Sequence, residues 1–142
     1  MFDCSIKDQY VSISKHRSND FDTLEKIIKD YYPDYLSYFY AIVNGKNASY
    51  CNSYIMRKSV IKKYFEWLFP LLDIFDKTLD ITEYDQQEKR AVGYVAEILI
   101  NVWIKHNKIK VKYEYMVEND ESSFIKYIMN IVNINTLRIK NI

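Results

Sequence analysis

The chain has 142 residues, with 20 basic and 19 acidic side chains and a formal net charge of +1. This balance argues against a general DNA- or RNA-binding protein, which attracts phosphates with an excess of positive charge. Hydrophobic residues make up 49%, as in globular proteins, but only 2 glycines and 2 prolines are present. So few glycines and prolines argue against all-β sandwiches, which need many tight turns, and against glycine-rich phosphate loops. We therefore expect one helix-rich domain over residues 1–142.

The two cysteines, Cys4 and Cys51, lack the CxxC spacing of zinc and redox sites, so no metal site is predicted. Two thiols agree with a reducing cytoplasm, although one disulfide stays open. The N-terminus has no apolar core of a signal peptide. The most apolar windows, 64–75 and 91–104, are shorter than the about 20 residues that cross a bilayer. The sequence favours a cytoplasmic location, at most peripheral at the inner face of the membrane.

The first part of the chain predicts three helical segments. Residues 5–14 form either a short helix or an extended lead-in. Apolar residues at helical spacing then indicate a helix with Asn19 or Asp20 as its N-cap. Because the residue before a proline avoids the α region, this helix ends before Pro33. Pro33 suits the first turn of the next helix, which is expected to end near Val43 at a left-handed glycine cap.

Two segments have strand patterns. Ser49–Met56 is short, aromatic and β-branched. Lys108–Tyr115 alternates apolar and charged residues with the period of two of a half-exposed strand. With about five helices, these two short strands predict a predominantly helical α+β fold.

Three further helices are expected in the second part of the chain. Lys58–Leu79 has the apolar stripe of a long helix, and Pro70 inside it predicts a kink or break near Glu66–Phe69. Asp85–His106 is apolar nearly all round, so this helix should be buried on most sides. Apolar spacing predicts a last helix within the tail at 116–142.

The helix over 85–106 carries one polar stripe, formed by Gln86, Arg90, Gly93, Glu97, Asn101 and Lys105. The stripe is either the solvent face or the lining of a cleft. Gly93 favours the cleft, because a glycine inside a helix costs about 1 kcal/mol relative to alanine and often marks close approach by a backbone or a ligand. In a cleft, Arg90 would bind a phosphate or carboxylate, and Glu97 would hold a sugar hydroxyl or accept a proton.

The two histidines have simpler interpretations. His16 lies near Asp20 and Asp22 and is more often a surface or capping residue than a catalytic or metal-binding one. His106 ends a helix, where a positive charge suits the helix dipole. The 14 tyrosines could stack on sugars, but amphipathic packing with the hydroxyl at the surface is the simpler interpretation.

The string YCNSYIMRKSVIKKYFEWLFPLL, followed by YDQQEKRAVGYVAEILINVWI, resembles the C-terminal half of the DUF4422 family. The family pattern has an asparagine-containing strand, a helix with E-W-L-F-P, and a Q-K-R-x-x-G-[FY]-x-x-E-R-L segment. The counterparts here are Asn52–Met56, Glu66–Pro70 and Gln87–Leu99. An upstream stretch with His16 also resembles the family, so the resemblance covers residues 5–115. The family occurs in bacterial capsular and exopolysaccharide gene clusters and is regarded as glycosyltransferase-like.

The resemblance implies the acceptor-side half of a GT-A-like glycosyltransferase that acts in the biosynthesis of a surface polysaccharide, such as capsule, exopolysaccharide or lipopolysaccharide. Glu97 would be the catalytic base or would orient the acceptor hydroxyl. Arg90 would contact a donor phosphate or an acidic group. Asn52, His16 and Gln87 would line the same cleft and bind substrate.

The resemblance also implies that the chain is truncated, because it starts where the family's second half starts. The nucleotide-sugar-binding half would be missing, and Ile98 stands where the family motif has an arginine. For the intact enzyme the resemblance implies a nucleotide sugar and a glycan acceptor and leaves open whether a divalent metal is used; no cofactor is expected in this chain. Whether the chain is an enzyme by itself stays open. The alternative is a non-catalytic helical interaction module that pairs with itself or with a separately encoded N-terminal half.

Overall fold

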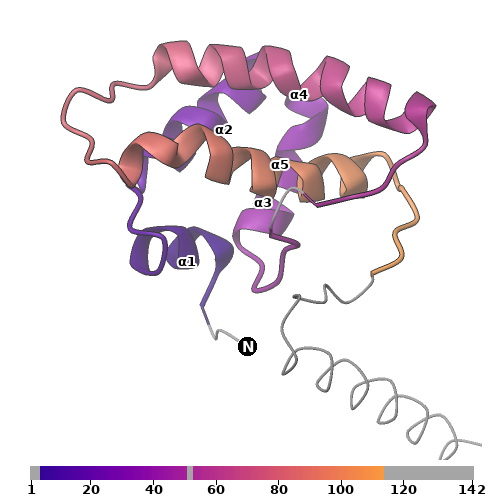
Figure 1. Cartoon of the computed structure of the whole chain (residues 1–142), viewed down its shortest axis with the longest axis horizontal. Coiled ribbons are helices and arrows are strands. Elements are labelled where there is room, and N and C mark those ends of the chain that lie inside the picture. The colour runs from indigo at the N-terminus through magenta and orange to yellow at the C-terminus, as the bar shows by residue number, and fades with distance from the viewer. Residues whose placement is uncertain (1–3, 51–52, 114–142) are drawn as a thin grey trace, which may run out of the picture. The chain divides into compact units, whose positions relative to one another are not determined.

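The computed structural model describes residues 4–50 and 53–113. The chain divides into two compact units, Met1–Ile109 and Lys110–Ile142. In the first unit, the described residues form helices connected by loops (Figure 1). The α-helices are α1 (Ile6–Ser12), α2 (Asn19–Tyr31), α3 (Leu36–Val43), α4 (Lys58–Thr78) and α5 (Ala91–His106), and 3-10 turns at Pro33–Tyr35 and Glu88–Arg90 lead into α3 and α5.

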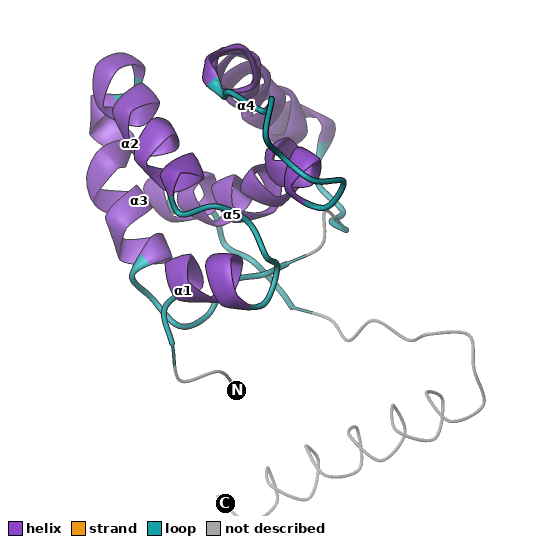
Figure 2. Cartoon of the chain, turned by 90° about the vertical axis from the view of Figure 1, so that its left-hand side faces the viewer, coloured by secondary structure: helices purple, strands orange, loops and turns teal. Residues whose placement is uncertain are grey.

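Helix α5 is the central element of this unit. It packs against both α3 and α4, while α2 contacts α3 and α4, and α1 contacts α3. In Figure 2, α2 and α3 form one side, α4 forms the other, and α5 lies between them. This position explains the nearly uniform apolar composition of α5 and confirms that the helix is buried on most sides.

The core forms where the apolar faces of these helices meet. Helix α5 contributes a run of buried side chains that includes Val95, Leu99 and Val102, none of which exposes measurable surface. Across from them lie Tyr64 and Phe75 of α4, which are also fully buried. Burying each large apolar side chain contributes about 1.5–3 kcal/mol, so this junction holds the helices together.

Helix α1 confirms the interpretation of residues 5–14 as a short helix. The Ser5 hydroxyl accepts a hydrogen bond from the Asp8 backbone N–H at 3.1 Å, and the Asp8 carboxylate accepts one from the Ser5 backbone N–H at 3.2 Å. This reciprocal capping box satisfies two amides that would otherwise be unpaired. The Ile6 N–H also donates to the Gly45 carbonyl at 2.8 Å, which ties α1 to the end of α3.

Two capping predictions are wrong. Helix α2 begins at Asn19 itself, after Ser18, and no side chain caps it. Asp20 instead points inward and is fully buried. Gly45 follows α3 as expected, but its φ is not positive, so it forms no left-handed cap.

Neither predicted strand is found in the described parts of Ser49–Met56 and Lys108–Tyr115. At Ser49 the backbone N–H and carbonyl pair with the Asn101 side chain, which takes the place of a partner strand. At Lys108 the φ of 52° departs from extended geometry. The part of the fold that the structure describes is therefore helical rather than α+β. The helix expected within 116–142 lies outside the described residues.

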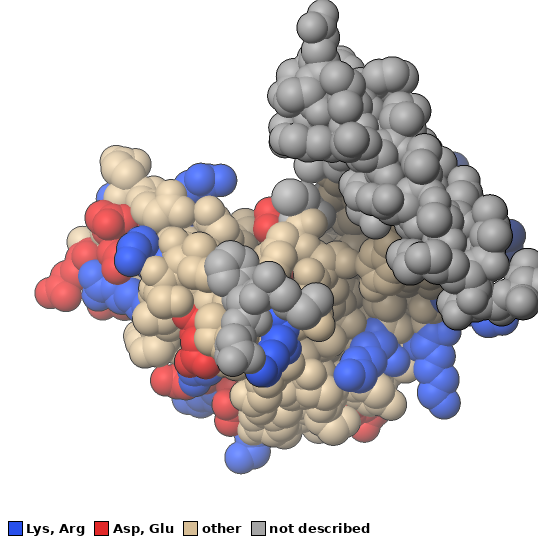
Figure 3. Space-filling view, turned by 90° about the horizontal axis from the view of Figure 1, so that it is seen from below, with Lys and Arg blue, Asp and Glu red and all other residues tan. Residues whose placement is uncertain are grey.

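The break predicted near Pro70 does not occur, because α4 runs through it as one helix. Pro70 and its neighbour Phe69 lie on the exposed side of α4. No helix within the described ranges is both long and apolar enough to cross a bilayer. Charged side chains of both signs occur on the face shown in Figure 3, in agreement with the net charge of +1.

Candidate functional site

Three of the predicted site residues meet around Tyr94, in the first turns of α5. The His16 and Tyr94 ring centroids lie 4.4 Å apart. The Gln87 side-chain amide donates a hydrogen bond to the Tyr94 hydroxyl at 3.0 Å. The Arg90 guanidinium carbon lies 5.4 Å from the centroid of the Tyr94 ring, in a cation–π contact. We call these four residues the Tyr94 cluster; Tyr94 itself is not among the site residues predicted from the sequence.

His16 is buried, with 3% of its surface exposed, so its interpretation as a surface or capping residue is wrong. Its ring also stacks on that of Tyr10, with the centroids 4.7 Å apart. Neither ring nitrogen has a hydrogen-bonding partner among the residues that the structure describes. Burial lowers the pKa of His16, against the opposing effect of the Asp20 negative charge. The imidazole is therefore held neutral as a packing element of the cluster.

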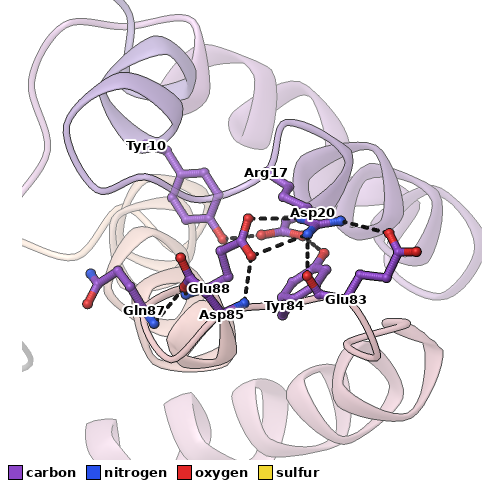
Figure 4. Close-up of polar contacts among 8 residues, drawn as sticks. All are labelled: Tyr10, Arg17, Asp20, Glu83, Tyr84, Asp85, Gln87 and Glu88. Atoms are coloured by element: carbon purple, nitrogen blue, oxygen red, sulfur yellow. Dashed lines mark hydrogen bonds and ion pairs between the residues drawn. The ribbon is translucent and has the colours of Figure 1, made fainter.

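Behind Tyr10 lies a buried carboxylate, that of Asp20 (Figure 4). It accepts hydrogen bonds from the Tyr10 hydroxyl at 2.6 Å and from the Tyr84 hydroxyl at 2.5 Å. Burial and the bond to Asp20 raise the pKa of both tyrosines, so both remain donors at neutral pH. No sequence pattern signals this network, because Asp20 and Tyr84 are 64 residues apart.

An ion pair fastens the start of α5 to the loop that carries His16. The Arg17 guanidinium binds the Glu88 carboxylate at 2.9 Å and donates to the Glu83 carbonyl at 2.6 Å. The same guanidinium lies 4.5 Å from the centroid of the Tyr84 ring. Glu88 and Asp85 in turn accept each other's backbone N–H, both at 2.8 Å. The hydrogen bond from Arg17 lowers the pKa of Glu88, so this carboxylate stays ionised.

Glu97, the predicted catalytic residue, lines a pocket of about 230 Å³ between α1 and α5. The apolar walls of this pocket include Ile6, Ile13 and Ile98, and Tyr94 forms part of the same lining. Glu97 follows Arg90 by seven residues, which is about 10 Å along a helix. The structure therefore places Glu97 next to the Tyr94 cluster, with the Tyr94 ring common to both.

Gln9 is a buried polar residue of the pocket that the sequence pattern did not reveal. Its side-chain amide donates to the carbonyls of Cys4 at 3.0 Å and Lys46 at 3.1 Å. Its amide oxygen accepts a hydrogen bond from the Tyr50 hydroxyl at 3.0 Å. These bonds fix the Tyr50 hydroxyl at the pocket, although 44% of the surface of the residue is exposed.

The polar stripe of α5 divides between the two interpretations left open. Gly93 is exposed, and nothing lies within 4 Å of the position that a Cβ would take, so no backbone approaches it closely. Asn101 faces inward, where its side chain exchanges two hydrogen bonds with the Ser49 backbone at 2.9 and 3.0 Å. The stripe is thus exposed to solvent at Gly93, lines the pocket at Glu97 and is half-buried at Asn101.

The remaining predicted residues have separate places. Asn52 lies outside the described residues, so its part in the cleft stays a prediction. His106 stacks on Tyr35, with ring centroids 3.7 Å apart. Over 4–50 and 53–113, no three His, Cys, Asp or Glu side chains gather as ligands for a metal ion.

Comparison with known proteins places the chain in a family. The chain is similar to a solved structure described as the WbbM bifunctional glycosyltransferase in its apo form. The two are 27% identical with a TM-score of 0.69, over 78% of this chain and 19% of that chain. No match is found among curated proteins. A family model described as "Domain of unknown function (DUF4422)" matches residues 1–108, most of the sequence, and the chain therefore belongs to the DUF4422 family.

Proposed function

We propose that this chain is a glycosyltransferase-like protein of surface polysaccharide biosynthesis and that it supplies the acceptor-binding side of the reaction. The likeness to WbbM, at 27% identity and a TM-score of 0.69, carries this proposal. Because the chain spans 19% of that structure, the transfer reaction itself is proposed for the whole enzyme rather than for these residues alone.

The geometry supports distinct roles for the predicted residues. Arg90 is exposed beside Tyr94, where its guanidinium can bind an acidic group such as a donor phosphate. Glu97 lines the pocket, where its carboxylate can orient an acceptor hydroxyl or accept its proton. His16 is buried and Gln87 bonds to the Tyr94 hydroxyl, so both would act by positioning Tyr94. Asn52 is proposed to join them at the cleft.

The donor belongs to a second part of the proposal. We propose that the sugar and the nucleoside of the donor, and a divalent metal where the reaction uses one, bind outside the described residues, and that only a donor phosphate reaches Arg90. The proposed place of action is the cytoplasmic face of the membrane. The small pocket supports this division, because about 230 Å³ lies below the roughly 300–1,000 Å³ of pockets for larger ligands.

The experiment is calorimetric titration of the full chain. The probes are capsule, exopolysaccharide and O-antigen oligosaccharides, with UDP-glucose and UDP-galactose in parallel. We expect at least one oligosaccharide to bind, and the double variant Arg90→Ala with Glu97→Ala to weaken its affinity about tenfold, or about 1.4 kcal/mol. The control is Lys29→Ala with Glu66→Ala, which removes one exposed charge of each sign from α2 and α4. Absence of oligosaccharide binding, or binding that survives the first double variant, contradicts the proposal.

A second candidate function is a non-catalytic interaction module. It is favoured by apolar side chains that are exposed on α4 and on the segment that leads into it. Phe69 is 56% exposed and contacts Phe65 at 4.8 Å between ring centroids. Ile55, just before α4, is fully exposed. Light scattering over a concentration series separates the two candidates. Self-association that the Phe69→Ser variant abolishes would favour the interaction module. A protein that stays monomeric at every concentration would count against the module.

A further inference from the structure

The pocket between α1 and α5 has walls that are fixed before any ligand arrives. His16 packs behind the Tyr94 ring at 4.4 Å, and Gln87 holds the Tyr94 hydroxyl at 3.0 Å. The Tyr50 hydroxyl is held by Gln9, which is itself bonded to two backbone carbonyls. Binding to such a pocket costs little conformational entropy, because the aromatic side chains are already ordered.

The chemistry of the lining is mixed in a way that suits a sugar ring. Isoleucine and tyrosine side chains offer apolar and aromatic surface to the C–H faces of a pyranose. Glu97 offers carboxylate oxygens, and the Tyr94 hydroxyl can donate as well as accept. Burial raises the pKa of Tyr50, and the negative charges of Cys4 and Glu97 raise it further.

Glu97 also selects among possible occupants. An apolar peptide side chain would remove water from the Glu97 carboxylate and add no hydrogen-bond donor, and this desolvation would raise the free energy of the bound state. An acidic sugar would place a second negative charge beside it. A neutral sugar supplies hydroxyl donors and no charge. The volume of about 230 Å³ suits one ring rather than a nucleotide sugar.

The mouth of the pocket is open to solvent. Ile13 is 49% exposed and Tyr50 is 44% exposed, and both line the pocket. A ring seated between them can continue into solvent as a longer chain. From these features we infer that the pocket between α1 and α5 is a subsite for one neutral hexose ring of a glycan. The inference rests on the proposed function and gives its acceptor a binding position.

Saturation-transfer NMR on the full chain tests this subsite. The probes are the methyl glycosides of glucose, galactose, mannose and N-acetylglucosamine, with the methyl glycoside of glucuronic acid as the charged comparison. We expect at least one neutral glycoside to bind. The Tyr50→Leu variant should bind that glycoside with an affinity at least fivefold lower. The matched control is Tyr31→Leu, which removes another exposed tyrosine ring, 62% exposed, at the end of α2. The glucuronide should bind more weakly than the neutral sugars, and Glu97→Gln should reduce that difference.

The results separate this inference from the proposed function. Oligosaccharides that bind wild type and Tyr50→Leu equally well would overturn the subsite and leave the proposed function standing. Failure of all four neutral glycosides to bind would also overturn the subsite. Neutral glycosides that bind through Tyr50, with no oligosaccharide bound, would support the subsite and contradict the acceptor role. Circular dichroism of each variant establishes that it is folded.

Discussion

The imidazole of His16 lies against the ring of Tyr94, with their centroids 4.4 Å apart. This contact joins the loop between α1 and α2 to the first turns of α5, which are 78 positions further along the chain. It also joins the buried Asp20 network, through Tyr10, to the exposed guanidinium of Arg90. The candidate site is therefore connected to two buried polar residues, His16 and Asp20.

His16 should make the stability of the protein depend on pH. Because burial lowers its pKa from the ordinary 6.5, the unfolded chain binds a proton before the folded chain does. Stability should be full above pH of about 6.5 and should fall as the pH drops from there toward the lowered pKa. Urea denaturation at several pH values above about 5 measures this, because carboxylates titrate mostly below that range. The His16→Phe variant keeps an aromatic ring, and its free energy of unfolding should no longer depend on pH in this range. If the free energy of unfolding of the variant changed with pH as steeply as that of wild type, His16 would not be the source of the dependence.

Asp20→Asn should destabilise the protein by about 1–3 kcal/mol. The substitution keeps the shape but removes the charge that accepts hydrogen bonds from Tyr10 and Tyr84 in the interior. The matched control is Asp22→Asn, because the Asp22 carboxylate is exposed and pairs with Lys7 at 3.0 Å. This variant should lose less than about 1 kcal/mol of the free energy of unfolding. Equal midpoints of urea denaturation for the two variants would show that the buried network contributes nothing special.

Gly93→Ala should stabilise the protein by up to about 1 kcal/mol. Gly93 lies inside α5, and a Cβ there would meet nothing within 4 Å. Alanine reduces the entropy of the unfolded chain and favours the helix. Thermal denaturation of wild type and variant measures the effect. A lower Tm in the variant would mean that this surface is not open in solution.

Asn101→Asp should loosen the segment around Ser49. The aspartate keeps the size of the side chain but loses the donors that bind the carbonyls of Ser49 and Glu97. We expect the free energy of unfolding to fall by about 1–3 kcal/mol and the backbone amides of residues 48–50 to exchange faster with solvent. Asn47→Asp, an exposed change in the same loop, is the control. Unaltered exchange in Asn101→Asp would show that this side chain does not hold the segment.

Local pattern is enough to predict most of the helical elements. The stripe over Lys58–Leu79 corresponds to α4, and the apolar run ending at His106 corresponds to α5. A helix is stabilised by contacts three and four residues apart, so apolar spacing and breakers such as Pro33 carry the information. The predicted strands have no such basis. Strand formation needs a partner strand, and the side chain of Asn101 replaces one at Ser49.

The sequence by itself determined that the described part of the chain is mainly helical and that α5 is buried on most sides, although it also predicted two strands that the structure lacks. Only the tertiary structure decided that His16 and Asp20 are interior groups and that Tyr94 is the centre of the site. The reason is physical. Burial of a polar group depends on which distant residues surround it, here tyrosines from α1, α5 and the loop before α5. No spacing along the chain encodes such contacts, whereas the period of a helix is written in its own residues.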